Sequence, residues 1–423
     1  MNDTMNNGIN VVYYTQNLRD LLWVLPIWRE TGGTFCSELE ITQKLVRDYD
    51  ATLPFAHLPT KNKLTIGRDV VTKKLSIKRK QIRLEIEHIA RELRPDVVVT
   101  TSNHRHAMSR ERRAQLAQTD IYWNGFKQVQ AFHGVSSKGV KFNNWMSDFD
   151  LLLLPGRREK ARFEQLFREP RASEDQVFGA SRSDLQSTPQ MALIGHPKAD
   201  RVLRGEITRE SARHELQLGD KPTVLYAPTH GALSSFFAWG ESIINAIPTS
   251  CNLIVKPHPS LATTSESEGA SRDLLRVRKL LESRGALWLP HAPDVMPLMA
   301  ASDVLITDYS SVAEEWLVFD RPIVFADHLA NATGRDRAQR ERGDWNGIFG
   351  CGHVVTEIDN MKISIDLALS EALGATSSTR CDGFSDGFSA ARQQLRDEVF
   401  EQLNGNCARR AADAIRALVV GHD

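Results

Sequence analysis

Short apolar runs alternate along the chain with longer polar or amphipathic stretches. Several of the runs, such as residues 149–154 and 303–307, are largely continuous in Val, Leu and Ile. Such runs are typical of parallel strands that are buried on both faces of a sheet. The pattern predicts ten strands, at residues 9–14, 96–101, 128–132, 149–154, 191–194, 223–227, 252–256, 286–289, 303–307 and 322–325.

Stretches with helical spacing of apolar residues lie between these strands, at 17–30, 38–48, 69–93 and 272–284, and the pattern predicts helix again at 390–419. The alternation of strand and helix predicts an α/β protein with parallel sheets. One set of strands falls between residues 9 and 154 and a second between 223 and 325. We therefore expect a domain boundary near residues 200–220.

Composition places the chain among soluble globular proteins. It has 423 residues, with 41% hydrophobic and 25% charged residues, and Lys+Arg and Asp+Glu are both 53. These values exclude disordered and collagen-like chains, and neutrality removes the simplest argument for nucleic-acid binding. The polar start and the short apolar runs predict neither a secretory signal nor a spanning helix. Five scattered cysteines without C-x-x-C predict free thiols in a reducing compartment, so we expect a cytoplasmic or peripheral protein.

Neutrality conceals one strongly basic segment. Residues 61–83 hold nine basic residues and one acid, while Val71, Leu75 and Ile82 keep helical spacing. A solvated surface helix would explain the apolar stripe but not the one-sided charge, which an anionic membrane surface or a polyanionic acceptor would explain. The basic residues that we assign to this contact are Lys73, Lys74, Lys78, Arg79 and Lys80.

Polar motifs follow three strands of the second set, where ligands of open α/β sheets bind. After strand 303–307 come Asp308, Ser310 and Ser311, with a helix predicted to start at one of the two serines. Hydroxyls and free backbone N–H groups at a helix start favour an anion such as phosphate. The alternative is a plain serine N-cap.

The other two motifs are Lys256-Pro257-His258 after strand 252–256 and Thr229-His230-Gly231 after strand 223–227. A lysine and a histidine can each donate to phosphate oxygens. The alternatives are a rigid proline loop with a surface histidine and an ordinary Pro/Gly turn.

One motif of the first set could supply a catalytic base. His133 and Gly134 follow strand 128–132, and the imidazole titrates near neutrality. The run to Gly139 misses the phosphate-binding P-loop because Val140 stands where lysine is needed. A structural histidine is the alternative. His104 and His106 lack a third ligand with metal-site spacing, and Asp148 and Asp150 lead into an apolar strand, so no metal ion and no cofactor is predicted.

Taken together, the motifs resemble the CDP-glycerol glycerophosphotransferase family, whose members build teichoic acids and related capsule polymers. The resemblance covers about residues 125–330. It depends on Phe132-His133-Gly134 with Lys138, Gly195-His196-Pro197-Lys198-Ala199-Asp200, Leu225-Tyr226-Ala227-Pro228-Thr229, His258-Pro259, the run from Ser302 to Val312, and Asp320-Arg321-Pro322-Ile323-Val324-Phe325, with a weaker echo at Asp386-Gly387 and Arg392.

The resemblance implies a GT-B fold, with two Rossmann-like domains facing across a cleft and a C-terminal helix crossing back. It implies an acceptor-binding domain at 1–205, a nucleotide-donor-binding domain at 206–389, and C-terminal helices at 390–423 that pack back toward the first. His133 and His258 would be catalytic, as general base and leaving-group ligand. By the resemblance, Ser310 and Ser311 would hold the pyrophosphate of the donor. The residues themselves add Thr229, His230, Lys256, Asp308 and Glu315 as donor-binding, and Gly134, Lys138 and the basic residues 73–80 as acceptor- or membrane-binding. Glu314 is an equal candidate for the ribose contact assigned to Glu315.

The implied reaction moves an alditol phosphate, glycerol phosphate first, from a CDP-alditol donor to a hydroxyl of an anionic polymer or lipid-linked acceptor, with release of CMP. This implies a transferase of the cell envelope at the inner face of the membrane. Lys198, where the family usually has arginine, and the segment after Val312 depart from the family pattern and leave the transferred group open. The alternatives are a GT-B glycosyltransferase or epimerase that uses a nucleotide sugar, and a non-catalytic polyanion-binding protein.

Overall fold

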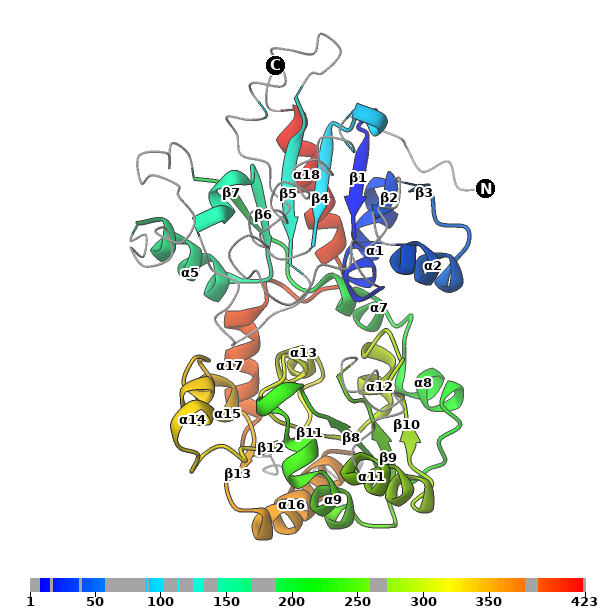
Figure 1. Ribbon diagram of the computed structural model, residues 1–423, viewed down its shortest axis with the longest axis vertical. Coiled ribbons are helices and arrows are strands. Elements are labelled where there is room, and N and C mark those ends of the chain that lie inside the picture. The colour runs from blue at the N-terminus through cyan, green and yellow to red at the C-terminus, as the bar shows by residue number, and fades with distance from the viewer. Residues whose placement is uncertain are drawn as a thin grey trace, which may run out of the picture. The chain divides into compact units, whose positions relative to one another are not determined.

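The computed structural model describes residues 8–15, 18–37, 40–57, 89, 91–101, 113, 125–132, 144–168, 188–258, 272–376 and 387–420. These residues form two compact units. The first contains the described residues up to Asp200 and residues 400–420, and the second contains Arg201–Val399. Predicted strand–helix alternation and parallel sheets are both confirmed, because every strand pair in either sheet is parallel (Figure 1).

The first unit is built on a seven-stranded sheet of order β3-β2-β1-β4-β5-β6-β7. Its strands are β1 (Val11–Tyr14), β2 (Thr34–Ser37), β3 (Phe55–His57), β4 (Val97–Thr100), β5 (Lys127–Ala131), β6 (Leu151–Leu154) and β7 (Gln190–Leu193). Its helices are α1 (Leu18–Thr31), α2 (Glu40–Tyr49), α5 (Arg157–Arg168), α18 (Cys407–Val420) and the short helical turns η1 (Asn144–Asp148) and η3 (Pro197–Ala199).

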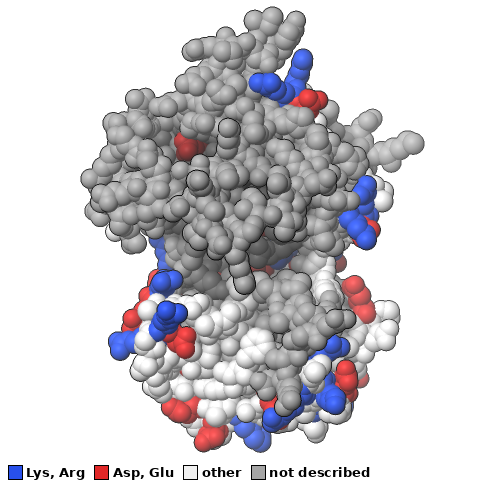
Figure 2. Space-filling view, viewed as in Figure 1, with Lys and Arg blue, Asp and Glu red and all other residues white. Residues whose placement is uncertain are grey.

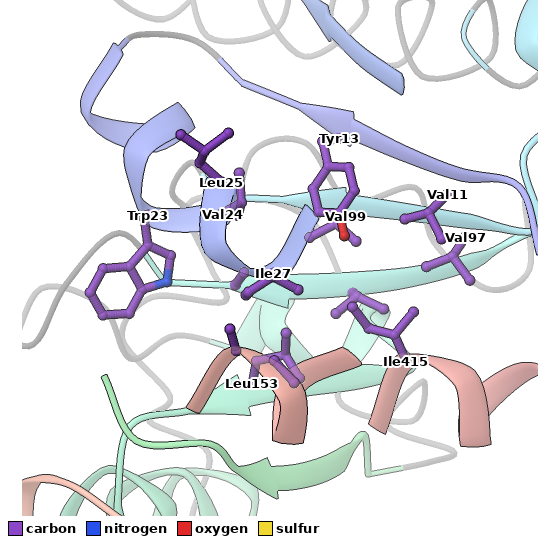
Figure 3. Close-up of a cluster of buried hydrophobic side chains, with 14 of the residues drawn as sticks. Val11, Tyr13, Trp23, Val24, Leu25, Ile27, Val97, Val99, Leu153 and Ile415 are labelled. Carbon is purple, nitrogen blue, oxygen red and sulfur yellow. The ribbon is translucent and has the colours of Figure 1, made fainter. Parts of the chain in front are cut away.

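Both faces of this sheet are covered, as continuous apolar strands require. Alternate residues of the strands, such as Val11, Tyr13 and Val99, pack with α1 and α18 in one core that includes Ile415 (Figure 3). The residues between them, such as Val12 and Val98, belong to a second cluster on the other face. The side-chain period of two in a strand therefore buries every position of β1 and β4.

The second unit has a six-stranded sheet of order β10-β9-β8-β11-β12-β13. Its strands are β8 (Thr223–Ala227), β9 (Asn252–Val255), β10 (Leu287–Trp288), β11 (Val304–Thr307), β12 (Ile323–Ala326) and β13 (His353–Val355). Its helices are α8 (Arg209–Glu215), α9 (Ser235–Ala246), α11 (Arg272–Ser283), α12 (Met296–Ala301), α13 (Val312–Trp316), α14 (Gly334–Arg340), α15 (Asn346–Phe349), α16 (Met361–Thr376) and α17 (Ser389–Val399). The short α7 (Asp200–Leu203) begins at the boundary, and η4 (Gly231–Leu233), η5 (Leu317–Phe319) and η6 (Ile358–Asn360) are 3-10 turns.

One face of the second sheet packs against α9, α11 and α16 in a single apolar core. The strand residues of that core again alternate, for example Val304 and Ile306 in β11. In each sheet the first three strands follow one another toward one edge, and the later strands are added on the other side of the first strand, as in a Rossmann fold. The strand order therefore reverses between β1 and β4 in the first sheet and between β8 and β11 in the second.

All ten predicted strands overlap an observed strand, whereas β2, β3 and β13 were not predicted. These three are Thr-Phe-Cys-Ser, Phe-Ala-His and His-Val-Val, and none holds more than two successive apolar residues, so no apolar run marks them in the sequence. The predicted helix 69–93 lies outside the described residues except for residue 89 and residues 91–93. In the described part of the chain, no helix is long and apolar enough to span a membrane.

Residues 390–419 were predicted to be helical, and the chain forms two helices there, α17 and α18. Asn404-Gly405-Asn406 separates them, with Gly405 at a φ of 77°. Helix α17 belongs to the second unit, where the buried Arg392 donates to Asp320 at 2.8 Å. Helix α18 belongs to the first unit and packs along α1. The chain thus returns to its first unit at its C-terminal end.

The Gly195–Asp200 motif receives this returning segment. Both carboxylate oxygens of Asp200 accept hydrogen bonds from the first amides of α18, from Cys407 at 3.0 Å and Ala408 at 2.7 Å. Gly195 has a φ of 81°, and a Cβ there would lie 2.5 Å from the carbonyl oxygen of Glu401. The motif therefore has a structural role in docking the C-terminal helix.

Candidate functional site

The predicted donor residues of the second unit lie at the carboxyl ends of β8, β9 and β11. These strands are neighbours, and the reversal of strand order falls between β8 and β11. In doubly wound sheets the loops at such a reversal diverge and leave a crevice in which ligands bind.

His230 and His258 are brought together by β8 and β9. Their imidazole rings stack, with centroids 4.0 Å apart and an angle of 29° between the ring planes. His230 is exposed and His258 is half-buried. Gly231, next in the chain, has a φ of 67°, a conformation that glycine adopts without a steric penalty. Two imidazoles therefore share one place at the sheet edge, where they can donate to an anion.

Lys256 precedes this pair on the same strand end. Its side chain is half-buried, and its ammonium donates to the carbonyl oxygen of Pro257 at 3.3 Å. Its backbone N–H continues the sheet by donating to the carbonyl oxygen of Tyr226 at 2.9 Å. The lysine is thus fixed beside β8 at the same edge as His258.

Asp308 is buried, and its carboxylate holds the loop after β8. One oxygen accepts from the backbone N–H of Thr229 at 2.8 Å. The other accepts from the backbone N–H and the hydroxyl of Ser235, at 2.7 and 2.9 Å. Burial raises the pKa of Asp308, while the donors of Ser235 and Thr229 and the nearby His328 oppose that shift. Asp308 therefore fixes the loop that carries His230, and its direct contact with a ligand stays a prediction.

The two predicted serines lie immediately after Asp308. Ser310 is buried, and its hydroxyl accepts from the backbone N–H of Val312 at 3.4 Å. Ser311 is half-buried and is the N-cap residue of α13, without a hydrogen bond from its own side chain to the helix. The helix thus begins one residue beyond the predicted serines. Glu314 and Glu315 are both buried in its first turn, so burial does not choose between them.

The residues predicted for the catalytic base and for the acceptor or membrane all lie outside the described residues: His133, Gly134, Lys138, Lys73, Lys74, Lys78, Arg79 and Lys80. On the described part of the face in Figure 2, Lys and Arg are interspersed with Asp and Glu. Among the described residues, no group of three or more His, Cys, Asp or Glu side chains is placed to hold a metal ion. Asp150 accepts from the buried Arg113 and from the backbone N–H of Gln128, which explains it as a strand-entry residue.

The sequence reasoning missed Ser235 and the residues after β12. Ser234 caps α9 through its hydroxyl, and the Ser-Ser pair before an apolar helix is an N-cap signal. Asp327 and His328 follow β12 just as His258 follows β9, so the strand-end rule would have found them. The His328 imidazole lies 3.3 Å from the carbonyl oxygen of Ala232, beside the loop that carries His230.

Two doubly wound parallel sheets in one chain, with the last helix returned to the first sheet, define the GT-B class of fold. Residues 75–331 match the sequence profile of a family described as CDP-Glycerol:Poly(glycerophosphate) glycerophosphotransferase. The chain belongs to this family of transferases.

Solved structures agree on the fold. The wall teichoic acid polymerase TagF matches 99% of this chain and 91% of its own, at 15% identity and a TM-score of 0.56. A putative UDP-N-acetylglucosamine 2-epimerase from Listeria monocytogenes matches 98% of both chains, at 14% identity and a TM-score of 0.54. At such low identity these similarities establish the fold alone.

A sequence relative is the teichoic acid poly(glycerol phosphate) polymerase of Bacillus spizizenii. It is 26% identical over 220 residues, which are 47% of this chain and 50% of the relative. The chain thus matches about half the length of this relative.

Proposed function

We propose that the protein transfers glycerol phosphate from CDP-glycerol to a hydroxyl group of a polymer or lipid-linked acceptor and releases CMP. Membership of the family supports this reaction. One observation carries the proposal. The stacked His230–His258 pair and the loop of Asp308, Ser310 and Ser311 lie at the ends of neighbouring strands, where the strand order of the second sheet reverses. Asp308 links the two places by accepting a hydrogen bond from the backbone N–H of Thr229. A diphosphate needs several hydrogen-bond donors in one place, and the imidazoles and the serine hydroxyls can supply them.

The donor is assigned to the second unit. His230, His258 and Lys256 would contact the diphosphate with the hydroxyls of Ser310 and Ser311, and Glu315 would contact the ribose. A structure of a TagF variant soaked with CDPG supports a CDP-linked donor in this class of protein. Asp308 contributes by holding Thr229 and Ser235, which keeps the histidine loop in place before the donor arrives.

In the proposed reaction, His133 accepts the proton of the acceptor hydroxyl as its oxygen attacks the β-phosphorus. The new O–P bond forms as the bond from the β-phosphorus to the CMP oxygen breaks, and CMP leaves with the negative charge. His258, Lys256 and the serines would stabilise that charge. Phosphoryl transfer depends mainly on positioning and electrostatic stabilisation, so this set of residues is sufficient without a covalent intermediate.

The acceptor is assigned to the predicted N-terminal domain, residues 1–205, where Gly134 and Lys138 follow the proposed base in the sequence. The basic segment 61–83 supports an anionic partner, either the growing polyphosphate chain or the inner face of the membrane. We therefore place the enzyme at the cytoplasmic face of the membrane as a peripheral protein. The polymer would be teichoic-acid-like or capsular.

A nucleotide-sugar reaction is the alternative, because the same fold occurs in the Listeria epimerase and in the UDP co-structure of Staphylococcus aureus MnaA (13% identity, TM-score 0.52, 97% of each chain). Incubation with CDP-glycerol and, separately, with UDP-sugars distinguishes the two. We expect CMP from CDP-glycerol in the presence of a glycerol-phosphate acceptor, and no UDP from the sugars. Release of UDP without release of CMP would contradict the proposal.

A further inference from the structure

Tyr309 lies between Asp308 and Ser310 and is completely buried. Its hydroxyl donates a hydrogen bond to the carboxylate of Asp327, the first residue after β12. Asp327 is itself 2% exposed, and its backbone N–H donates to the carbonyl oxygen of Val355 at 2.9 Å. The loop of residues 308–311, called the serine loop below, is therefore tied to two strand ends. Asp308 ties it to the loop after β8, and Tyr309 ties it to the end of β12.

Arg340, the last residue of α14, completes this arrangement. Its Nε donates to one oxygen of Asp327 at 3.0 Å and its Nη2 to the other at 2.7 Å. The paired geometry of a guanidinium and a carboxylate fixes the orientation of both groups. Burial and the neighbouring Asp327 raise the pKa of Tyr309, and the hydrogen bond to Asp327 raises that of Arg340. At neutral pH the tyrosine remains a donor and the arginine remains charged.

Helix α14 lies at the surface of the second unit. None of its residues is buried, and it packs against the turn η4 that follows His230. After the helix, the indole of Trp345 donates to the carbonyl oxygen of Arg340 at 2.7 Å and packs against the ring of Tyr309, with centroids 5.1 Å apart. Arg340 thus links a surface helix to a buried tyrosine within the serine loop.

We propose that Arg340 is a positioning residue for donor binding, which acts by holding Asp327 and, through it, Tyr309 and the backbone of the serine loop. The role rests on the proposed function, in which that loop binds the diphosphate of the donor. Without the arginine, the buried carboxylate of Asp327 would lose its charged partner and the two hydrogen bonds that fix its orientation. The tyrosine would then lose its fixed acceptor, and the serines would lose their fixed positions.

Titration calorimetry with CDP tests this role in the whole protein. Arg340→Gln should weaken CDP binding about tenfold or more, the effect of losing hydrogen bonds to a charged group, and Arg340→Lys by less. Arg337→Gln is the matched control, because Arg337 is an exposed arginine of the same helix that pairs with Glu341 at 2.7 Å. It should bind CDP as the wild type does. In turnover, Arg340→Gln should raise the KM for CDP-glycerol and leave kcat within about twofold.

The double variant Asp327→Asn/Arg340→Gln separates positioning from stability, because no buried carboxylate is left uncompensated. It should melt near the wild-type temperature and still bind CDP weakly. If Arg340→Gln, or a stable double variant, bound CDP with wild-type affinity, the positioning role would be wrong while the proposed function stood. If the wild type itself did not bind CDP, the proposed function would fail and this role with it.

Discussion

The carboxylate of Asp308 accepts three hydrogen bonds and is almost fully buried, which makes it the residue on which the site's loops depend. Because Asp308 follows a strand, the sequence predicted that it contacts a ligand. In the structure its carboxylate joins the end of β11 to the loop after β8. Sequence spacing identifies residues at strand ends but does not say which of them face the ligand and which face the protein. His230 and His258 were predicted as site residues for the same reason. Their stacking depends on the pairing of β8 with β9, which the sequence alone does not show.

Asp308→Asn tests this role. The amide NH2 of asparagine would face a backbone N–H, so at least one hydrogen bond would be lost and a buried donor left unpaired. We expect a loss of about 1–3 kcal/mol in the free energy of unfolding, measured by urea denaturation. Asp220→Asn, at an exposed position, should change it by less than about 0.5 kcal/mol. Equal stability of the two variants would show that the three hydrogen bonds do not hold the loop.

The C-terminal helices show what could and could not be predicted at the scale of elements. Helical spacing at 390–419 was correct for both helices, but the break at residues 404–406 was missed although Asn-Gly is a turn signal. The docking of α18 on Asp200 joins residues more than two hundred positions apart. Strands such as β1, β4 and β6 were predicted because burial on both faces leaves a continuous apolar run, and β2, β3 and β13 hold at most two successive apolar residues.

Asp200→Ala should destabilise the first unit, because two first-turn amides of α18 lose their acceptor. The expected cost is about 1–2 kcal/mol, in the range of lost helix caps. Asp200→Asn, which keeps one acceptor oxygen, should cost less. The measurement is guanidinium denaturation followed by circular dichroism. An alanine variant as stable as the wild type would contradict the capping role of Asp200.

At the scale of the whole molecule, the order of the motifs predicted the fold and the family, and both predictions are confirmed. The acceptor and donor roles of the two domains stay predictions. Sequence placed the domain boundaries at residues 205/206 and 389/390, and the structure divides its units after Asp200 and again before Phe400. The strand order of the second sheet explains why the predicted donor motifs cluster after β8, β9 and β11. His133, the proposed base, and the basic segment 61–83 lie outside the described residues.

His133→Ala and His258→Ala separate the two proposed half-sites. His133→Ala should bind CDP as tightly as the wild type but lose about 10²–10⁴-fold in turnover, the contribution of a general base. His258→Ala should lose CDP affinity as well as turnover. His291→Ala, at an exposed position, is the control and should keep both. Near-normal turnover of His133→Ala would show that His133 is not the base.

The basic segment can be tested with vesicles. Replacement of Lys73, Lys74, Lys78, Arg79 and Lys80 by glutamine should reduce cosedimentation with phosphatidylglycerol vesicles by about 100-fold or more, since each basic residue contributes about 1 kcal/mol at an anionic surface. The matched control replaces five exposed basic residues of the described part, Lys44, Lys221, Arg335, Arg337 and Lys362. If both variants bound equally, the segment would not be the membrane contact.

The position of a label on the β-phosphate of CDP-glycerol tests the central claim most directly. Attack at the β-phosphorus carries that phosphate to the acceptor with the glycerol, whereas a glycosyltransferase-like attack at carbon leaves it on the nucleotide. With β-³²P-labelled donor and a glycerol-phosphate acceptor, the account predicts labelled polymer and unlabelled CMP in equal amounts. Labelled CDP with unlabelled polymer, or no transfer to any glycerol-phosphate acceptor, would contradict it.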